Sequence, residues 1–235
     1  MTIKAILFDK DGTLIDVTGT WVPVYREVLG ELFGKDASRV EELLVAAGYD
    51  PGKGGFKAGS TLAGGTTREL IDIWWPGLDA QEILEKVRLL DVEYRDVAVK
   101  HLKPLMPLGP ILSSLRSAGY RLGVATNDTQ ASATSHLHEL GVAAMFDMIV
   151  GADTVTVPKP AGEMVRTFGA AVGLRPGDIA MVGDNPHDME EARNGGAGLA
   201  IAVLSGNAGH GELDHLADHV IPSIAHLQTL LEELR

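Results

Sequence analysis

The sequence contains no cysteine, few aromatic residues and fewer basic than acidic side chains. The absence of cysteine from all 235 residues excludes disulfides, thiolate metal sites and cysteine nucleophiles. The 20 Lys and Arg residues against 32 Asp and Glu residues give a formal charge of −12, and such a surface repels nucleic acids and anionic lipids. We therefore expect neither nucleic acid nor a membrane among the partners of this protein.

Long hydrophobic runs are also missing. The apolar run at residues 1–8 is too short for the core of a signal peptide, and charged residues follow it directly. No later stretch approaches the roughly 18 uncharged apolar residues of a membrane span. Because hydrophobic residues make up 45% of the chain, the composition is that of an ordinary globular protein. We expect a cytoplasmic protein, as a monomer or a homodimer.

Short, β-branched apolar runs alternate with helical patterns along much of the chain. This alternation predicts an α/β fold, a Rossmann-like parallel sheet core with helices on both faces. In such sheets ligands bind at the carboxyl ends of the strands. The strands are expected at 3–8, 121–126, 147–150, 179–183, 199–204 and 219–221, and the helices at 111–118, 129–140, 161–172, 188–194 and 224–234.

Residues 17–102 interrupt the alternation and show helical patterns without a convincing strand. Trp21, Tyr25, Val28 and Leu32, for example, lie at the spacing of one helical face. We predict a catalytic core of residues 1–16 and 103–235 with an inserted helical cap, 17–102, that closes over the site. The glycine-rich stretch 49–67 fits no phosphate-loop or dinucleotide pattern and is expected to be a flexible loop, with substrate contact as the alternative.

The first polar motif, Asp9-Lys10-Asp11-Gly12-Thr13, directly follows the first predicted strand. Alternation in an extended chain places Asp9 and Asp11 on the same side, and Gly12 permits a sharp turn. Two carboxylates about 4 Å apart repel by about 4 kcal/mol at an effective dielectric constant of 20. The motif therefore predicts a bound cation or a shared proton, unless it is only an Asp-Gly turn.

Three further polar groups follow other predicted strands: Thr126-Asn127, Lys159 between two prolines, and Asp184 with Asp188. Each alone could be a helix cap, a surface lysine or a turn. At one sheet edge, however, the carboxylates suit Mg²⁺, while lysine, hydroxyl and amide groups suit the oxygens of a phosphate. Together they predict phosphoryl transfer to a carboxylate.

The order of these motifs resembles that of the haloacid dehalogenase (HAD) superfamily, most closely the branch of capped phosphatases such as phosphoglycolate phosphatases. The motifs are Phe-Asp-Lys-Asp-Gly-Thr-Leu at 8–14, Thr-Asn at 126–127, Pro-Lys-Pro at 158–160 and Gly-Asp-x-x-x-Asp at 183–188, so the resemblance covers essentially the whole chain. It implies Mg²⁺-dependent hydrolysis of a small phosphorylated metabolite, either phosphoglycolate-like or a sugar phosphate.

The resemblance also implies a role for each matching residue. Asp9 would be the nucleophile that forms an aspartyl phosphate, and Asp11 would be the general acid and then the general base. Lys159 would neutralise charge on Asp9 and on the phosphate. The phosphate-binding residues would be Thr126, Asn127, Lys159 and Gly12, and Mg²⁺ would be held by Asp9, Asp11 (through its backbone carbonyl), Asp184 and Asp188.

Three other functions fit the same motifs: a phosphomutase, a phosphonatase and a binding protein without activity. A phosphonatase would need a cap lysine, for which Lys35, Lys53 and Lys57 are the candidates, but Asp11 argues against it. Lys10 departs from the phosphatase branch, which usually has an apolar residue there. Lys10 could face the substrate or support a turn.

Overall fold

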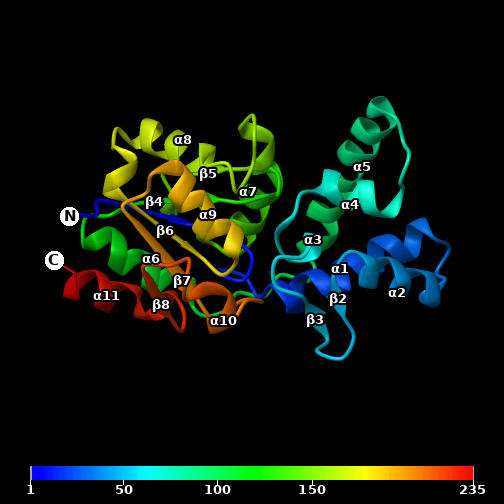
Figure 1. Cartoon of the computed structure of the whole chain (residues 1–235), viewed down its shortest axis with the longest axis horizontal. Helices are drawn as coiled ribbons and strands as arrows, with labels where there is room; N and C mark the ends of the chain where they lie inside the picture. Colours follow the sequence, from blue (N-terminus) through cyan, green and yellow to red (C-terminus); the bar gives the residue numbers. More distant parts are fainter. Residues whose placement is uncertain (1, 235) are drawn as a thin grey trace.

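The computed structural model describes residues 2–234, and its core is built around a six-stranded sheet in the order β5-β4-β1-β6-β7-β8 (Figure 1). Every neighbouring pair in this sheet is parallel. The chain runs outward from β1 to one side and then returns to fill the other, so the middle of the sheet is a topological switch point. The strands are β1 (Ala5–Phe8), β4 (Arg121–Ala125), β5 (Met148–Val150), β6 (Ile179–Gly183), β7 (Leu199–Val203) and β8 (His219–Ile221).

Helices cover both faces of the sheet, because alternate strand residues point in opposite directions. In β1, Ile6 and Phe8 pack into the hydrophobic cluster that includes α6 and α11, whereas Ala5 and Leu7 pack into the one that includes α8 and α9. The predicted α/β fold is therefore confirmed, with strand ends within two residues of those expected. The core helices are α6 (Leu108–Ser117), α7 (Gln130–Glu139), α8 (Glu163–Val172), α9 (Pro186–Gly195), α10 (His210–Leu213) and α11 (Leu227–Glu233).

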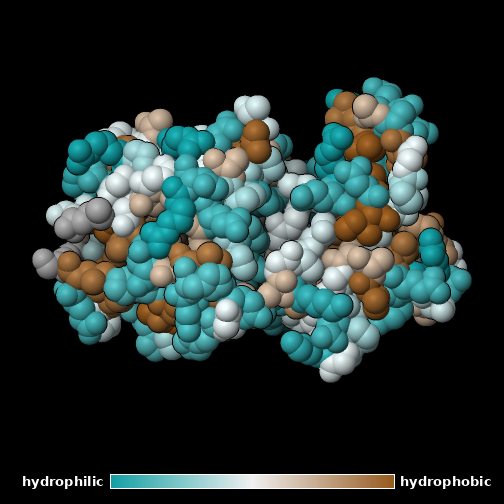
Figure 2. Space-filling view, viewed as in Figure 1, coloured by the Kyte–Doolittle hydropathy of each residue, from teal (hydrophilic) through white to brown (hydrophobic). Residues whose placement is uncertain are grey.

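The inserted segment forms a second lobe with a hydrophobic core of its own (Figures 1 and 2). Stacked and edge-to-face contacts among Trp21, Tyr25 and Tyr94 join its longest helices. None of the helices in residues 2–234 has the length and apolar character needed to cross a membrane. The cap helices are α1 (Val17–Leu32), α2 (Ala37–Ala46), α3 (Thr61–Gly64), α4 (Thr67–Trp74) and α5 (Ala80–Ala98).

The cap is not entirely helical, which corrects the sequence-based expectation. Strands β2 (Tyr49–Asp50) and β3 (Gly55–Phe56) pair as an antiparallel hairpin inside the glycine-rich stretch. Gly54 adopts a left-handed backbone (φ 69°), and its N–H donates to the carbonyl of Asp50 at 2.8 Å. Each strand has only two residues, too few for an alternating pattern to be visible in the sequence.

Two chain passages that lie side by side connect the lobes. The N–H of Asp16 donates to the carbonyl of Lys103 at 2.8 Å, and the N–H of Leu105 donates to the carbonyl of Leu14 at 3.1 Å. The carboxylate of Asp16 also caps α1 by accepting from the N–H of Gly19 at 2.8 Å. These paired passages lie where the core and cap were predicted to join, although the boundaries at 16/17 and 102/103 stay a prediction.

A buried polar cluster lies where the cap meets the core. The side chain of Lys10 is fully buried there, and its Nζ lies 2.7 Å from Asp11 Oδ2, 3.0 Å from Asp128 Oδ2 and 3.3 Å from His136 Nδ1. The indole ring of Trp21, from the cap, lies with its centroid 5.2 Å from the same ammonium. Because three acceptors surround the three protons of this ammonium, Lys10 has no donor left for a substrate.

Burial and charge set the protonation of this cluster. Burial lowers the pKa of Lys10, but the carboxylates of Asp11 and Asp128 outweigh burial and raise it above its usual value. Burial, together with the Lys10 ammonium, lowers the pKa of His136 to about 4. His136 is therefore neutral at pH 7 and can accept from Lys10 through Nδ1.

Replacing Lys10 should destabilise the protein strongly. Lys10→Met removes the counter-charge of two carboxylates, and breaking such a buried ion pair costs about 3–5 kcal/mol. Urea denaturation at pH 7 measures this loss as a lower free energy of unfolding. The matched control is Lys4→Met, because Lys4 is half exposed in its pair with Asp178 and should change stability by less than about 1 kcal/mol. Equal midpoints for the two variants would contradict the prediction.

His136 should make stability depend on pH. The unfolded chain takes up a proton at the ordinary histidine pKa near 6.5, whereas the folded protein takes it up only near 4. The contribution of His136 to stability is therefore complete above about pH 6.5, and about 3 kcal/mol of it is lost as the pH falls toward 4. His136→Asn lacks this loss, so its unfolding free energy should fall less steeply than that of the wild type. Parallel pH profiles in chemical denaturation would show that the prediction is wrong.

Candidate active site

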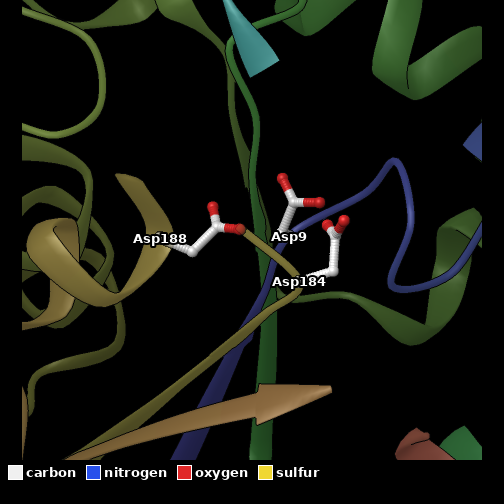
Figure 3. A group of neighbouring side chains, drawn as sticks. All are labelled: Asp9, Asp184 and Asp188. Carbon is white, nitrogen blue, oxygen red and sulfur yellow. The ribbon is translucent and has the colours of Figure 1, made fainter. Parts of the chain in front are cut away.

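The predicted site residues meet at the carboxyl ends of the strands. Asp9 directly follows β1, Thr126 follows β4, Asp184 follows β6, and Asp188 lies in the first turn of α9. Figure 3 shows the carboxyl groups of Asp9, Asp184 and Asp188 gathered on the same side of the sheet edge. Each of these three residues has a carboxylate oxygen within 4.8 Å of the others. Residues 175 positions apart in the sequence therefore form one acidic cluster.

Lys159 supplies the positive charge of this cluster. Its Nζ donates to Asp9 Oδ1 and to Asp188 Oδ1, at 2.7 Å each. Burial lowers the pKa of Lys159, but the two carboxylates outweigh burial and raise it above its usual value. Burial in turn raises the pKa of Asp188, while Lys159 and His187 more than reverse this and keep it below its usual value. The Lys159–Asp188 pair is therefore charged on both sides.

Too little positive charge lies near the other two carboxylates, those of Asp9 and Asp184. Burial raises the pKa of Asp9 to about 7, because the negative charges nearby offset much of the effect of Lys159. Burial and repulsion from Asp9 and Asp188 raise the pKa of Asp184 well above its usual value. Asp184 Oδ2 accepts from the N–H of Asn207 at 3.0 Å, but Asp184 Oδ1 is buried without a hydrogen-bond partner.

This arrangement fits a hard divalent cation. A buried carboxylate oxygen without a donor is costly, and a bound cation would satisfy it. Carboxylate oxygens are the ligands that such ions prefer. A cation would also offset the mutual repulsion that raises the pKa values of Asp9 and Asp184. The donor set therefore suits a metal ion.

Gly12 makes room for Asp184. Its backbone is left-handed (φ 91°), and a Cβ at this position would lie 2.5 Å from the Asp184 carboxyl group. A Cβ on Gly206 would lie even closer to the same carboxyl group, so no side chain fits on either glycine. The Gly12 N–H donates to the carbonyl of Ile15 at 2.7 Å. The part of Gly12 in phosphate binding stays a prediction.

Thr126 and Asn127 both line the cavity of the site, but their polar groups have different partners. The hydroxyl of Thr126 accepts from the N–H of Asp128 at 3.1 Å, which shapes the start of the following turn. The amide of Asn127 donates to the carbonyl of Gly64 at 2.8 Å and accepts from the N–H of Lys159 at 3.1 Å. Asn127 therefore joins the cap to the lysine loop, and phosphate binding by either residue stays a prediction.

Asp11 is held from both lobes. Trp21 Nε1 donates to Asp11 Oδ1 at 2.6 Å, and Lys10 Nζ lies 2.7 Å from Asp11 Oδ2. Asp11 nevertheless lines the cavity beside Asp9. The position of its carboxyl group therefore depends on a cap residue as well as on the core.

A cavity of about 60 Å³ lies between the two lobes. Residues 62–65 form part of its wall, so the glycine-rich stretch contacts the site and is not only a flexible loop. His187 also lines the cavity, and burial lowers its pKa. The candidate cap lysines do not line it; they are Lys35, Lys53 and Lys57.

Three residues that line the cavity were not predicted from the sequence: Trp21, Tyr94 and Asp128. The two aromatic residues stand in apolar helical stripes, which predict burial but not a neighbouring cavity. Asp128 follows Thr126-Asn127 at a strand end, and that position was the available signal.

Comparisons with known proteins agree with this geometry. The family described as haloacid dehalogenase-like hydrolase matches residues 3–196. Pyrophosphatase PpaX of Bacillus velezensis is 31% identical over 209 residues, which cover 86% of this chain and 85% of that protein. Phosphoglycolate phosphatase of Chromobacterium violaceum is 29% identical over 230 residues, covering 98% and 97%. A solved haloacid dehalogenase-like hydrolase from Bacteroides fragilis has a TM-score of 0.74 at 23% identity, covering 96% of this chain and 100% of that one.

The family match spans more than half of the chain, and the relatives include proteins named as phosphatases. The resemblance seen in the motif order is thereby confirmed, as is the expectation of an enzyme that hydrolyses phosphoric monoesters. The chain belongs to the haloacid dehalogenase-like hydrolases.

Proposed function

We propose that the enzyme hydrolyses a small phosphate monoester with the help of Mg²⁺, through an aspartyl phosphate on Asp9. The observation that carries the proposal is the arrangement around Lys159, which bridges Asp9 and Asp188 while Asp184 keeps one oxygen free. A nucleophilic carboxylate can approach a phosphate dianion only if positive charge lies between them. One ammonium and one divalent cation would supply it here.

Asp9, Asp184 and Asp188 would hold the ion, with the backbone carbonyl of Asp11 as a further ligand. When bound, Mg²⁺ would screen the charge between Asp9 and the phosphoryl oxygens and stabilise the charge that develops during transfer. Asp188 also accepts from Lys159 and from the N–H of Asn185, so both of its oxygens already have hydrogen-bond partners. It would therefore stabilise the ion mainly as a negative charge that lies close to it.

In the first step, a carboxylate oxygen of Asp9 attacks phosphorus, and the bond from phosphorus to the ester oxygen breaks. Asp11 would enter this step in its protonated form and donate that proton to the departing oxygen, so a neutral alcohol leaves and Asp11 is left as the carboxylate. Lys159 donates two of its protons to Asp9 and Asp188, and the third is available to a phosphoryl oxygen.

In the second step, water attacks the phosphorus of the aspartyl phosphate and gives a proton to Asp11. The bond between phosphorus and Asp9 then breaks, which restores the free carboxylate and releases inorganic phosphate. Trp21 holds Asp11 only while the cap lies on the core. The cap would therefore exclude bulk water and complete the acid/base group in the same movement.

The relatives support hydrolysis, since they are named for pyrophosphate and phosphoglycolate. A phosphonatase receives no support, because none of the candidate cap lysines lines the cavity. No feature of the described residues favours a phosphomutase. The cytoplasmic location and the monomeric or homodimeric state stay predictions from the sequence.

Asp9→Asn should abolish turnover while keeping the fold. The amide has nearly the same shape but cannot act as the nucleophile, so phosphate release should fall at least about 1,000-fold. Thermal unfolding should occur at an equal or higher temperature, because one buried negative charge is removed from the cluster. Asp72→Asn, at an exposed cap position, is the control and should keep the wild-type rate. Substantial turnover by the Asp9 variant would contradict the proposed nucleophile.

Removing the metal should stop the reaction. EDTA should suppress phosphate release and added Mg²⁺ should restore it, because the acidic cluster then regains its cation. Mg²⁺ should also raise the melting temperature of the wild type but not that of Asp184→Asn. Asp178→Asn is the matched control, since Asp178 pairs with Lys4 away from the cluster, and it should keep the response to Mg²⁺. Full activity in EDTA would rule out the proposed cation.

A further inference from the structure

The cap side of the cavity is apolar and aromatic. Trp21, Tyr25, Leu62, Leu70 and Tyr94 form much of it, opposite the carboxylates of the core. Among the described residues, 2–234, no arginine and no lysine lines this cavity. The alcohol portion of a bound ester, which points away from Asp9 toward the cap, would therefore meet no cationic side chain.

Two lysines lie near the cavity, but neither can pair with a charged group in the alcohol portion of the ester. Lys10 already has Asp11, Asp128 and His136 around its three protons. Lys159 is directed at Asp9, on the phosphoryl side of the site.

A second anionic group on the substrate would also meet repulsion. Asp11 and Asp128 line the same cavity, and the carboxyl group of Asp91 lies just behind Thr67, whose hydroxyl donates to it at 2.6 Å. His187 does not compensate, because its Nε2 faces Asp188 of the core, 3.5 Å from Oδ1. A buried anion without a partner is strongly disfavoured.

The cap does offer one unused hydrogen-bonding group. The hydroxyl of Tyr94 is buried and has no partner, although Tyr94 lines the cavity. Among the cap residues that line the cavity in the described part of the chain, 2–234, Tyr94 is the one with a buried polar side-chain atom that lacks a partner. Burial raises the pKa of Tyr94 well above its usual value, so its hydroxyl keeps the proton and can donate.

We propose that the enzyme selects phosphate monoesters whose alcohol portion is small, uncharged and bears an oxygen that accepts from Tyr94, and that it discriminates against esters with a second anionic group. This inference rests on the proposed phosphatase function. The cavity of about 60 Å³ also limits size. One water needs about 10–15 Å³ on the same measure, so the closed site has room for a phosphoryl group and a few further atoms.

The charge selectivity can be tested with two esters of the same shape. Phosphoglycolate carries a carboxylate, and the phosphate ester of glycolamide carries a neutral carboxamide in its place. We expect kcat/KM for the amide, measured from released phosphate with Mg²⁺ at pH 7.5, to exceed that for phosphoglycolate at least about tenfold. An equal or higher value for phosphoglycolate would overturn the proposal.

The role of the hydroxyl can be tested with Tyr94→Phe. This variant should hydrolyse the glycolamide ester about five- to tenfold less efficiently, mainly through a higher KM, because one hydrogen bond to the substrate is lost. Tyr49→Phe is the matched control, because the Tyr49 hydroxyl accepts from Arg26 outside the cavity; it should behave as the wild type. Equal kinetics for Tyr94→Phe and Tyr49→Phe would remove Tyr94 from substrate recognition.

These outcomes separate the inference from the function on which it rests. If phosphate is released from both esters and phosphoglycolate is preferred, the phosphatase function stands and the substrate class is wrong. If neither ester nor any other small phosphate monoester releases phosphate, the proposed function fails and the inference fails with it.

Discussion

The site depends on the repulsion among carboxylates that the sheet brings to one buried edge. Neighbouring parallel strands end at the same edge of the sheet, so Asp9 and Asp184 lie close together once β1 and β6 pair. Lys159 pairs with both Asp9 and Asp188, but its single positive charge cannot balance both, and one oxygen of Asp184 has no donor. The fold thus leaves a charge imbalance that a divalent cation would correct. Repulsion among these carboxylates lowers the stability of the folded protein, and a bound cation would recover that free energy.

A second lysine, Lys10, supplies positive charge to another pair of carboxylates near the same strand end. Lys10 pairs with Asp11 and Asp128, and these two carboxylates share its single positive charge. The two lysines pair with different carboxylates: Lys159 with Asp9, the proposed nucleophile, and Lys10 with Asp11, the proposed acid/base group. Trp21 of the cap also contacts this second group, because its indole N–H donates to Asp11. Under the proposed mechanism, the contact with the cap would influence proton transfer through Asp11, whereas Asp9 pairs with Lys159 of the core.

The core could be predicted from the sequence because its signals are local. A short apolar run followed by Asp or Thr indicates a strand and its functional end, and β1, β4 and β6 follow that pattern. The cap could not be predicted as well. In α1 and α5, the spacing of Trp21 and Tyr94 indicates a buried face, but burial against a helix and burial against a cavity give the same pattern. Two partners of Lys10, Asp128 and His136, lie more than a hundred residues away along the chain, and no local pattern records such contacts.

The difference between the core and the cap also explains why family membership determines the reaction class more firmly than the substrate. In the proposed mechanism, the strand ends supply the nucleophile and its counter-charges, and these groups would act on the phosphoryl part that all such esters share. Selectivity is a difference between affinities for the remaining part, which the cap contacts. Relatives at 29–31% identity are named for pyrophosphate and phosphoglycolate, both of which carry additional negative charge beyond the reacting phosphoryl group. A cap face that presents Leu62, Leu70 and Tyr94 and no cation offers such charge nothing to pair with, so a conserved reaction does not require a conserved substrate.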